Sequence, residues 1–387
     1  MTEAKRLLAL DVLRGITVAG MILVNNPGNW SAVYAPLGHA AWNGLTPTDL
    51  VFPFFLFILG VSVYLSLRKS GFRCTRAVAW KIVRRTLVIF LIGWAVGWLS
   101  RFCATFNALS GEGLPFWDRV GRSCLTFDRM RILGVLQRLA ICYGVAAFVA
   151  VTMRHRLIPW IAAALLAVYG IVLGLGGGFT LSEDNVIAVV DRAVFGEAHM
   201  YHGEGFAFDP EGLLSTIPSI AHALIGFCCG AMLCGAKDVR ERMLRLFVAG
   251  GSLMLAGWLL SYGCPINKKI WSPSFVLVTC GMASSLLALL MWIVDVKGYR
   301  RWSRFFEVYG VNPLFLYVLG SVLSILLGQI RLPYGDGTMS LHGLICTLAL
   351  DPWLGAYPVS LAYALLMVGT VGAAGYFLYR KKIYIRI

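Results

Sequence analysis

Residues 7–26 read LLALDVLRGITVAGMILVNN, and this stretch decides the class of fold. Between Leu7 and Val24 the side chains are apolar apart from one acid, one arginine and one threonine. A bilayer is crossed by about 20 mostly apolar residues, so the stretch predicts a membrane helix. No small-residue cleavage site of the A-x-A type follows it, and we therefore interpret it as a retained helix rather than a signal peptide.

The composition of the whole chain agrees with a membrane protein. Of its 387 residues, 58% are hydrophobic and only 14% are charged, whereas an ordinary soluble domain is about 25% charged. The mean hydropathy is +0.74. These values predict an all-α, polytopic integral membrane protein whose lipid partner is the bilayer.

Ten segments are apolar and long enough to cross a bilayer, and they predict about ten transmembrane helices in a single domain, residues 1–387. The predicted spans are residues 7–26, 48–67, 80–99, 132–152, 157–175, 212–234, 243–261, 273–295, 309–328 and 357–379. The long loops on one side are then residues 27–47, 100–131, 176–211 and 329–356. Loops of this length tend to be functional.

The net charge of +15 is explained by topology, so we expect no nucleic-acid partner. Lysine and arginine gather in alternate loops, for example in residues 68–85, whereas residues 27–46 contain neither. The positive-inside rule then predicts that both termini are cytoplasmic and that the loop 27–47 lies outside. The outer loop 100–131 departs from the rule because it carries five arginines, and we expect it to fold back toward the bilayer.

The ten cysteines show no spacing typical of a zinc site, and no metal is predicted. Cys103 and Cys124 share the loop 100–131, so they can pair if that loop faces an oxidising compartment. The chain also lacks the phosphate-binding loop, the serine hydrolase elbow, the zinc protease motif and the dinucleotide fingerprint.

A second informative stretch follows the first span. Residues 37–53 read LGHAAWNGLTPTDLVFP and place His39 among polar residues beside the membrane, where an ionisable group is a functional hypothesis. Thr46, Pro47 and Asp49 have the spacing of a helix start, with Thr46 as N-cap and Asp49 as the acidic partner of a capping box. Asp49 therefore has both a structural and a functional interpretation.

Polar residues also occur within the predicted spans. Arg14 and Asn25 are eleven residues apart, which is three helical turns, so they share one face about 16 Å apart along the axis. The alternative is a packing face with an arginine that reaches the membrane surface. Arg138 lies within an apolar run and requires an anionic partner. Asp11 and Asp49 are the structural candidates, and an anionic ligand is the functional one.

Taken together, these segments resemble one known family, the transmembrane heparan-alpha-glucosaminide N-acetyltransferases and their bacterial relatives of the NagX type. The resemblance lies in Asp11–Gly15, Val24–Asn25, His39–Pro53, Gly134–Leu139, Asp209–Gly212, Asn267–Ser272 and Asn312–Tyr317. The stretch His39–Pro53 is the most specific of these, and the others follow in order along the chain.

The resemblance implies an enzyme that passes an acetyl group from cytoplasmic acetyl-CoA to the amine of a glucosamine-type sugar on the outer side of the membrane. The family's catalytic residues map onto His39 and Asn25. We interpret His39 as the base that accepts the ammonium proton in a direct transfer and Asn25 as a donor to the oxyanion of the thioester carbonyl. The alternative is an intermediate in which His39 itself carries the acetyl group. The resemblance also implies a homodimer.

The remaining site predictions concern the two substrates. Groups that can bind acetyl-CoA, chiefly its phosphates, are Arg14, Gln137, Arg138, Lys81, Arg84 and Arg85. Groups that can bind the amino sugar are Trp42, Asn43, Asp49, Asp209, Glu211, Lys268, Trp271 and Asn312. Carboxylates beside an aromatic suit a sugar or an amine, but such residues also occur at ordinary membrane interfaces.

Departures from the family narrow the prediction and leave two alternatives. The lysosomal enzymes have an additional N-terminal domain and one more span, so we expect a bacterial inner-membrane protein that acts on a small amino sugar. A sugar O-acyltransferase of the acyltransferase-3 type is one alternative, although that family has a histidine where this chain has Asn25. A secondary transporter is the other, because transporters also carry polar residues at the midplane.

Overall fold

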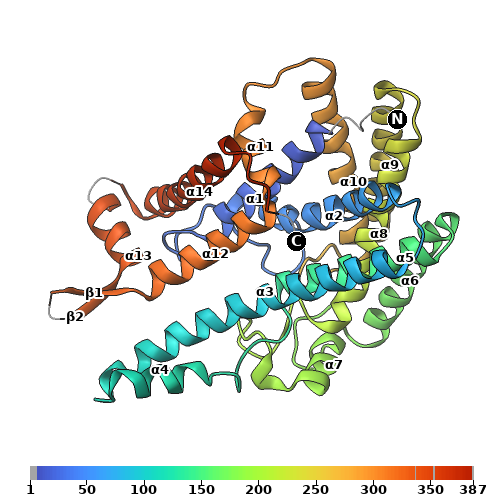
Figure 1. The fold of residues 1–387 in the computed structure, drawn as a ribbon. Coiled ribbons are helices and arrows are strands. Elements are labelled where there is room, and N and C mark those ends of the chain that lie inside the picture. The colour runs from blue at the N-terminus through green and yellow to red at the C-terminus, as the bar shows by residue number, and fades with distance from the viewer. Residues whose placement is uncertain (1–6, 336, 352–353, 386–387) are drawn as a thin grey trace.

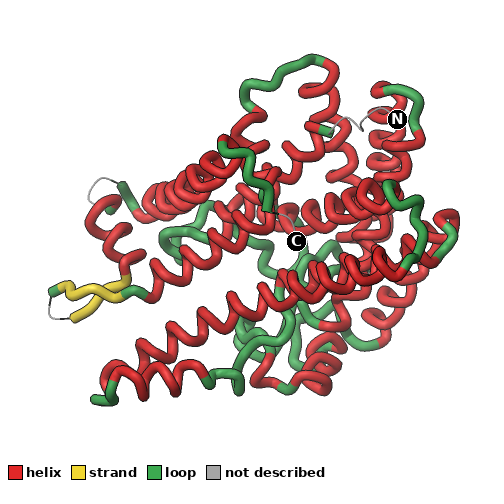
Figure 2. The backbone as a smooth tube through the Cα atoms, in the orientation of Figure 1, coloured by secondary structure: helices red, strands yellow, loops and turns green. Residues whose placement is uncertain are grey.

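A computed structural model describes residues 7–335, 337–351 and 354–385 as an almost entirely helical bundle (Figure 1). The helices are α1 Leu8–Asn25, α2 Val51–Arg68, α3 Arg76–Ala108, α4 Phe116–Cys124, α5 Val135–Thr152, α6 Ile158–Leu175, α7 Val186–Phe195, α8 Leu213–Gly235, α9 Val239–Leu260, α10 Pro273–Leu290, α11 Ser303–Val311, α12 Pro313–Gln329, α13 Leu341–Leu344 and α14 Ala356–Arg380. The strands β1 Arg331–Tyr334 and β2 Gly337–Ser340 form a two-stranded antiparallel hairpin (Figure 2).

The predicted all-α membrane architecture is confirmed in this part of the chain. Among the described residues, nine helices are long and apolar enough to cross a membrane, and a tenth crossing is formed if α11 and α12 count as one bent span. These two helices meet at 87°, where the sequence analysis predicts a span over 309–328. The bend lies before Pro313 because proline lacks an N–H and disfavours helical geometry in the residue before it.

The bundle is layered around five helices. More than half of the most apolar window of α1, α2, α5, α8 and α10 is buried, whereas only 6% of that of α3 is. In the centre of the bundle, glycine lets the backbones of α2 and α8 approach closely. A side-chain carbon on Gly60 of α2 would lie 1.9 Å from the carbonyl oxygen of Ala223 in α8, and one on Gly226 would lie 2.2 Å from the Phe57 oxygen.

Loops that are far apart in the sequence meet at one end of the bundle. Trp42 donates its Nε1–H to the carbonyl of Phe179 at 2.8 Å, and the amide of Gly44 donates to Ile266 at 2.8 Å. The amide of Ile132 likewise donates to the carbonyl of a residue in the segment after α7. We call residues 26–50, 125–134, 176–212 and 261–272 the loop end. These hydrogen bonds join segments that are far apart in the sequence into one end of the bundle.

Part of the segment 100–131 extends α3, and the helix that follows packs against it. α3 continues to Ala108, and α4 then lies beside the end of α3 (Figure 1). The guanidinium of Arg119 stacks over the ring of Phe106 at 4.1 Å and donates to the Phe106 carbonyl at 2.8 Å. Cys103 and Cys124 are both free thiols in the structure.

Candidate active site

The site is built on a helix start. The side chain of Thr46 accepts a hydrogen bond from the amide of Asp49, and Oδ2 of Asp49 accepts one from the amide of Thr46 at 3.1 Å. This is the predicted capping box, followed by Pro47 at the first helical position. It fixes the Asp49 carboxylate, which is 1% exposed, at the base of the loop that carries His39.

Asp49 also binds His39. Its Oδ1 lies 2.7 Å from Nδ1 of the imidazole, while Oδ2 accepts the Ala40 amide at 3.1 Å. The two interpretations of Asp49 are therefore compatible, because the cap and the histidine contact use different oxygens. A carboxylate only accepts, so the proton of the neutral imidazole is held on Nδ1 and the lone pair remains on Nε2. The His39 side chain is 43% exposed, which leaves it accessible.

Lys268 completes this group from the loop before α10. Its ammonium lies 3.0 Å from Nδ1 and 3.3 Å from Nε2 of His39, and 3.6 Å from Oδ1 of Asp49. Burial lowers the pKa of Lys268, although the charges of Asp49 and Glu211 oppose that shift. The neighbouring Asn267 donates to the side chain of Asn43 at 3.1 Å and so joins the two loops.

The predicted sugar-binding carboxylates form a second charged group with Arg131. Its Nε and Nη2 bind the carboxylate of Asp209 at 2.9 and 2.5 Å, and Nη2 also contacts Glu211 at 2.5 Å. Burial raises the pKa of Glu211, but the charges of Arg131 and Arg138 outweigh it, so the pKa lies below its ordinary value. Burial lowers the pKa of Arg131, and the two carboxylates more than reverse that effect.

Arg131 was not among the residues predicted for the site. The sequence did contain a feature that points to Arg131, because the five arginines of the loop 100–131 depart from the positive-inside rule. An arginine out of place by that rule calls for a carboxylate partner.

Arg138 is completely buried, and its predicted partners were wrong. Instead of Asp11 or Asp49, it donates to the carbonyl of Pro210 at 2.8 Å and to the hydroxyl of Ser215. Its guanidinium lies 5.2 Å from the ring centre of Trp271, which is 1% exposed. Both residues thus belong to the core that supports the loop with Asp209 and Glu211.

The residues predicted to bind the cofactor fall into separate groups. Arg14 binds Asp11 at 2.9 Å, Ser62 at 3.0 Å and the carbonyl of Gly310 at 3.2 Å, and so joins α1 to α2 and α11. Gln137 is buried against Gly93. The first turns of α3 carry the other three, of which Lys81 and Arg84 are exposed and Arg85 stacks over a tyrosine ring.

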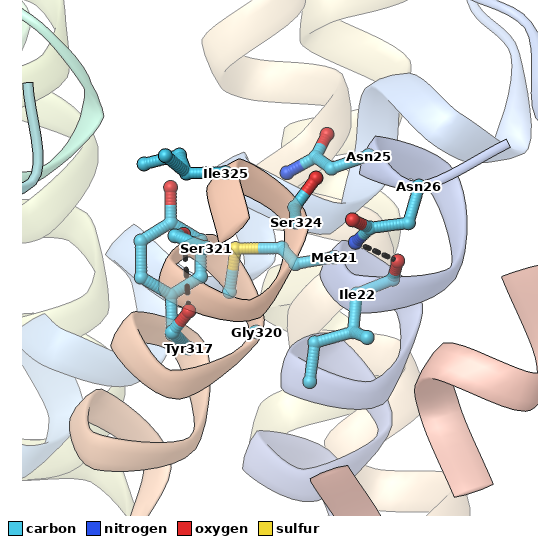
Figure 3. Close-up of a pocket in the computed structure, with 9 residues that line it drawn as sticks. All are labelled: Met21, Ile22, Asn25, Asn26, Tyr317, Gly320, Ser321, Ser324 and Ile325. Carbon is cyan, nitrogen blue, oxygen red and sulfur yellow. Dashed lines mark hydrogen bonds between the residues drawn. The ribbon is translucent and has the colours of Figure 1, made fainter. Parts of the chain in front are cut away.

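Asn25, the last residue of α1, lines a cavity of about 190 Å³ between α1 and α12. Figure 3 shows its side chain together with the hydroxyl groups of Tyr317, Ser321 and Ser324. Asn26 is buried, and its amide donates to the carbonyl of Ile22 at 2.7 Å. The cavity therefore presents amide and hydroxyl groups that can hold a carbonyl or a sugar.

Tyr317 lines the cavity and also interacts electrostatically with the second charged group. This side chain lies close enough to Glu211 and Arg131 for an electrostatic interaction, and Glu211 interacts in turn with Lys268. Among the described residues, no hydrogen bond joins Asn25 directly to His39. His39 is not among the residues that line the cavity of Asn25, so the two residues predicted to be catalytic lie in separate groups.

Two known proteins are similar to this chain over most of its length. Heparan-alpha-glucosaminide N-acetyltransferase of Mus musculus is 31% identical over 380 residues, covering 84% of this chain and 54% of that protein. The protein of the same name from Homo sapiens is 30% identical over 374 residues, with 81% and 52% covered. The chain is homologous to the heparan-alpha-glucosaminide N-acetyltransferases. It spans about half the length of these relatives, and no family model matches it.

Two residues predicted from the resemblance to these N-acetyltransferases have structural contacts. Asn312 lies at the bend between α11 and α12, donates to the carbonyl of Ile383 at 2.9 Å and accepts from Ile385 at 2.8 Å. It holds the C-terminal segment rather than lying at the loop end. Trp42 packs edge-on against Phe208 with ring centres 5.7 Å apart. In the described part of this homologue, no group of acids, cysteines and histidines is arranged to hold a metal.

Asp191 makes the stability of this acetyltransferase homologue dependent on pH. It is fully buried and accepts the Leu213 amide at 2.8 Å at the start of α8. Burial raises its pKa from 3.8 to about 6, so the folded protein holds the proton more tightly than the unfolded chain. The contribution to stability is complete below about pH 4 and is lost as the pH rises through 6.

We therefore expect the melting temperature to fall less between pH 5 and 7 in Asp191→Asn than in the unchanged protein, because the amide still accepts from Leu213 without ionising. Thermal unfolding followed by intrinsic fluorescence measures this, with the exposed Asp184→Asn as control. If the melting temperature of Asp191→Asn falls with pH as steeply as that of the unchanged protein, Asp191 does not titrate in this range.

Proposed function

We propose that this chain transfers an acetyl group from acetyl-CoA to the amine of a glucosamine-type sugar at the loop end of a bacterial plasma-membrane protein. The observation that carries the proposal is the pairing of His39 with the buried Asp49 carboxylate at 2.7 Å. A histidine held in one tautomer by a buried acid, with its second nitrogen accessible, is suited to general base catalysis. Similarity to two heparan-alpha-glucosaminide N-acetyltransferases supports the choice of acetyl transfer to an amino sugar.

His39 has two tasks in the reaction. Its Nε2 accepts the proton of the sugar ammonium, so that the nitrogen lone pair is free to attack the thioester carbonyl of acetyl-CoA. The C–N bond forms, the C–S bond breaks, and His39 returns its proton to the sulfur of CoA as it leaves. The nitrogen loses a second proton to water as the amide forms, so one proton is released overall. Asp49 stabilises the imidazolium between these transfers through Nδ1.

Asn25 supplies a donor for the oxyanion in this proposal, from the cavity between α1 and α12. We expect Asn25→Ala to reduce kcat by about 10²–10³-fold, because the loss of one oxyanion donor lowers kcat by that factor in other enzymes. Steady-state kinetics against acetyl-CoA concentration measure the effect, with Asn29→Ala in the following loop as control. An unchanged kcat would place the oxyanion elsewhere.

The donor substrate requires basic groups at the end of the bundle opposite His39. Lys81 and Arg84 are exposed on the first turns of α3, and Arg85 lies beside them with its guanidinium 4.7 Å from the ring centre of Tyr143. Three basic side chains on adjacent turns suit the phosphates of CoA. The buried Arg138 donates to the carbonyl of Pro210 and so contacts the loop of Asp209 and Glu211.

Purified protein in detergent, supplied with radiolabelled acetyl-CoA and glucosamine, tests the proposal. We expect label on the sugar nitrogen. Label on a hydroxyl, including that of an N-blocked sugar, would instead support O-acyl transfer. Failure to bind acetyl-CoA, together with uptake of unmodified sugar into vesicles, would support a transporter.

A further inference from the structure

Lys268 places a positive charge directly against the imidazole of His39. Its Nζ lies 3.0 Å from Nδ1 and 3.3 Å from Nε2, and its side chain is only 20% exposed. Nδ1 already donates to Asp49, so the similar distances to the two nitrogens place the ammonium beside the ring rather than on the lone pair of Nε2. The main effect of Lys268 on the imidazole of His39 is therefore electrostatic.

The charges of Asp49 and Lys268 act on His39 in opposite directions. A carboxylate within hydrogen-bonding distance favours the protonated imidazole, whereas a cation at a similar distance disfavours it. Asp49 and Lys268 are themselves 3.6 Å apart, so His39 faces an ion pair with no net charge. Without the lysine, a buried carboxylate would favour an imidazolium, which cannot accept a proton.

The position of Lys268 is fixed by its own loop. Its carbonyl accepts the Trp271 amide at 3.0 Å, and Trp271 adopts a left-handed backbone conformation with φ of 52°. The next residue, Lys269, binds Glu204 at 2.7 Å. The charged groups that act on Lys268 are thus Asp49 and Glu211, which favour its charge, and Lys269, which opposes it.

We propose that Lys268 is a positioning residue that cancels the charge of Asp49, so that His39 stays unprotonated while Asp49 still orients its ring. This role rests on the proposed function of His39 as a base. Asp49 fixes the tautomer, Lys268 keeps the ring neutral, and Nε2 is left to receive the proton of the acceptor ammonium.

The protonation state of His39 can be measured without any acetyl transfer. Diethyl pyrocarbonate modifies a histidine when its imidazole is neutral and not when it is protonated. Mass spectrometry of the peptide that contains His39 gives the extent of modification of this residue at each pH. In Lys268→Met and Lys268→Gln we expect the midpoint of modification to move to higher pH by about one unit, as loss of a close cation predicts. Lys268→Arg retains the charge, and Lys269→Met removes a charge that is paired with Glu204, so both should leave the midpoint in place.

An unchanged midpoint in both neutral variants would overturn the role of Lys268. A midpoint that moves, in a protein that transfers no acetyl group, would support the electrostatic role and reject the proposed function instead. If transfer is observed, the acidic limb of the pH profile of kcat/KM should move in the same direction in the two neutral variants. A limb that stays in place would also contradict the proposal.

Discussion

Replacing His39 by alanine should reduce acetyl transfer by about 10²–10⁴, which is the usual contribution of a general base. The variant loses the group that accepts the ammonium proton, whereas the capping box of Thr46 and Asp49 remains, because it uses Oδ2 rather than Oδ1. The fold and the binding of acetyl-CoA should therefore be unchanged. Initial rates at saturating substrates and titration with acetyl-CoA measure the two properties separately.

His202→Ala is the matched control, since this histidine also lies at the loop end but its ring contacts the carbonyl of Met200 instead of a carboxylate. It should retain the rate of the unchanged protein. Loss of acetyl-CoA binding in His39→Ala would indicate a structural role for His39, and a rate within a few-fold of normal would remove it from the chemistry.

Replacing Arg131 by methionine should destabilise the protein by about 3–5 kcal/mol, because it leaves buried carboxylates without their cation. The side chains of Asp209 and Glu211 are 3% and 14% exposed, so water solvates the two carboxylates poorly once Arg131 is removed. We expect a large decrease in the melting temperature in detergent. We also expect a higher KM for the acceptor, since these carboxylates form part of the proposed sugar site.

Arg129→Met provides the comparison, because Arg129 is 73% exposed and its contact with Asp128 is 3.9 Å long. An exposed pair of this kind contributes little, so this variant should melt like the unchanged protein. Similar melting temperatures for Arg129→Met and Arg131→Met would show that the charged group around Asp209 does not stabilise the loop end.

The membrane architecture could be predicted from the sequence because each span must bury about 20 apolar residues, a local property of the chain. Bends and extensions depend on more than hydropathy. α3 runs to Ala108, well beyond the predicted limit at residue 99, because the polar and aromatic residues of its last turns pack against α4. The sequence shows Pro313, but it does not predict that the chain changes direction there.

Within the site, local contacts were predictable and long-range ones were not. The capping box follows from the spacing of Thr46 and Asp49, so its geometry could be anticipated. The contact of Lys268 with His39 joins residues 229 positions apart, and no pattern in the sequence specifies it. Arg138 shows the same limit, since its carbonyl partners at 210 and 212 lie in a loop whose path only the packing determines.

In the proposed reaction, one chain joins a donor on one side of the membrane to an acceptor on the other. The most direct measurement uses sealed proteoliposomes with glucosamine trapped inside and labelled acetyl-CoA added outside, and compares them with vesicles that hold both substrates on one side. We expect N-acetylglucosamine inside the vesicles when the substrates are on opposite sides and the basic start of α3 faces outward. Product that forms only when both substrates share one side would contradict transfer across the membrane.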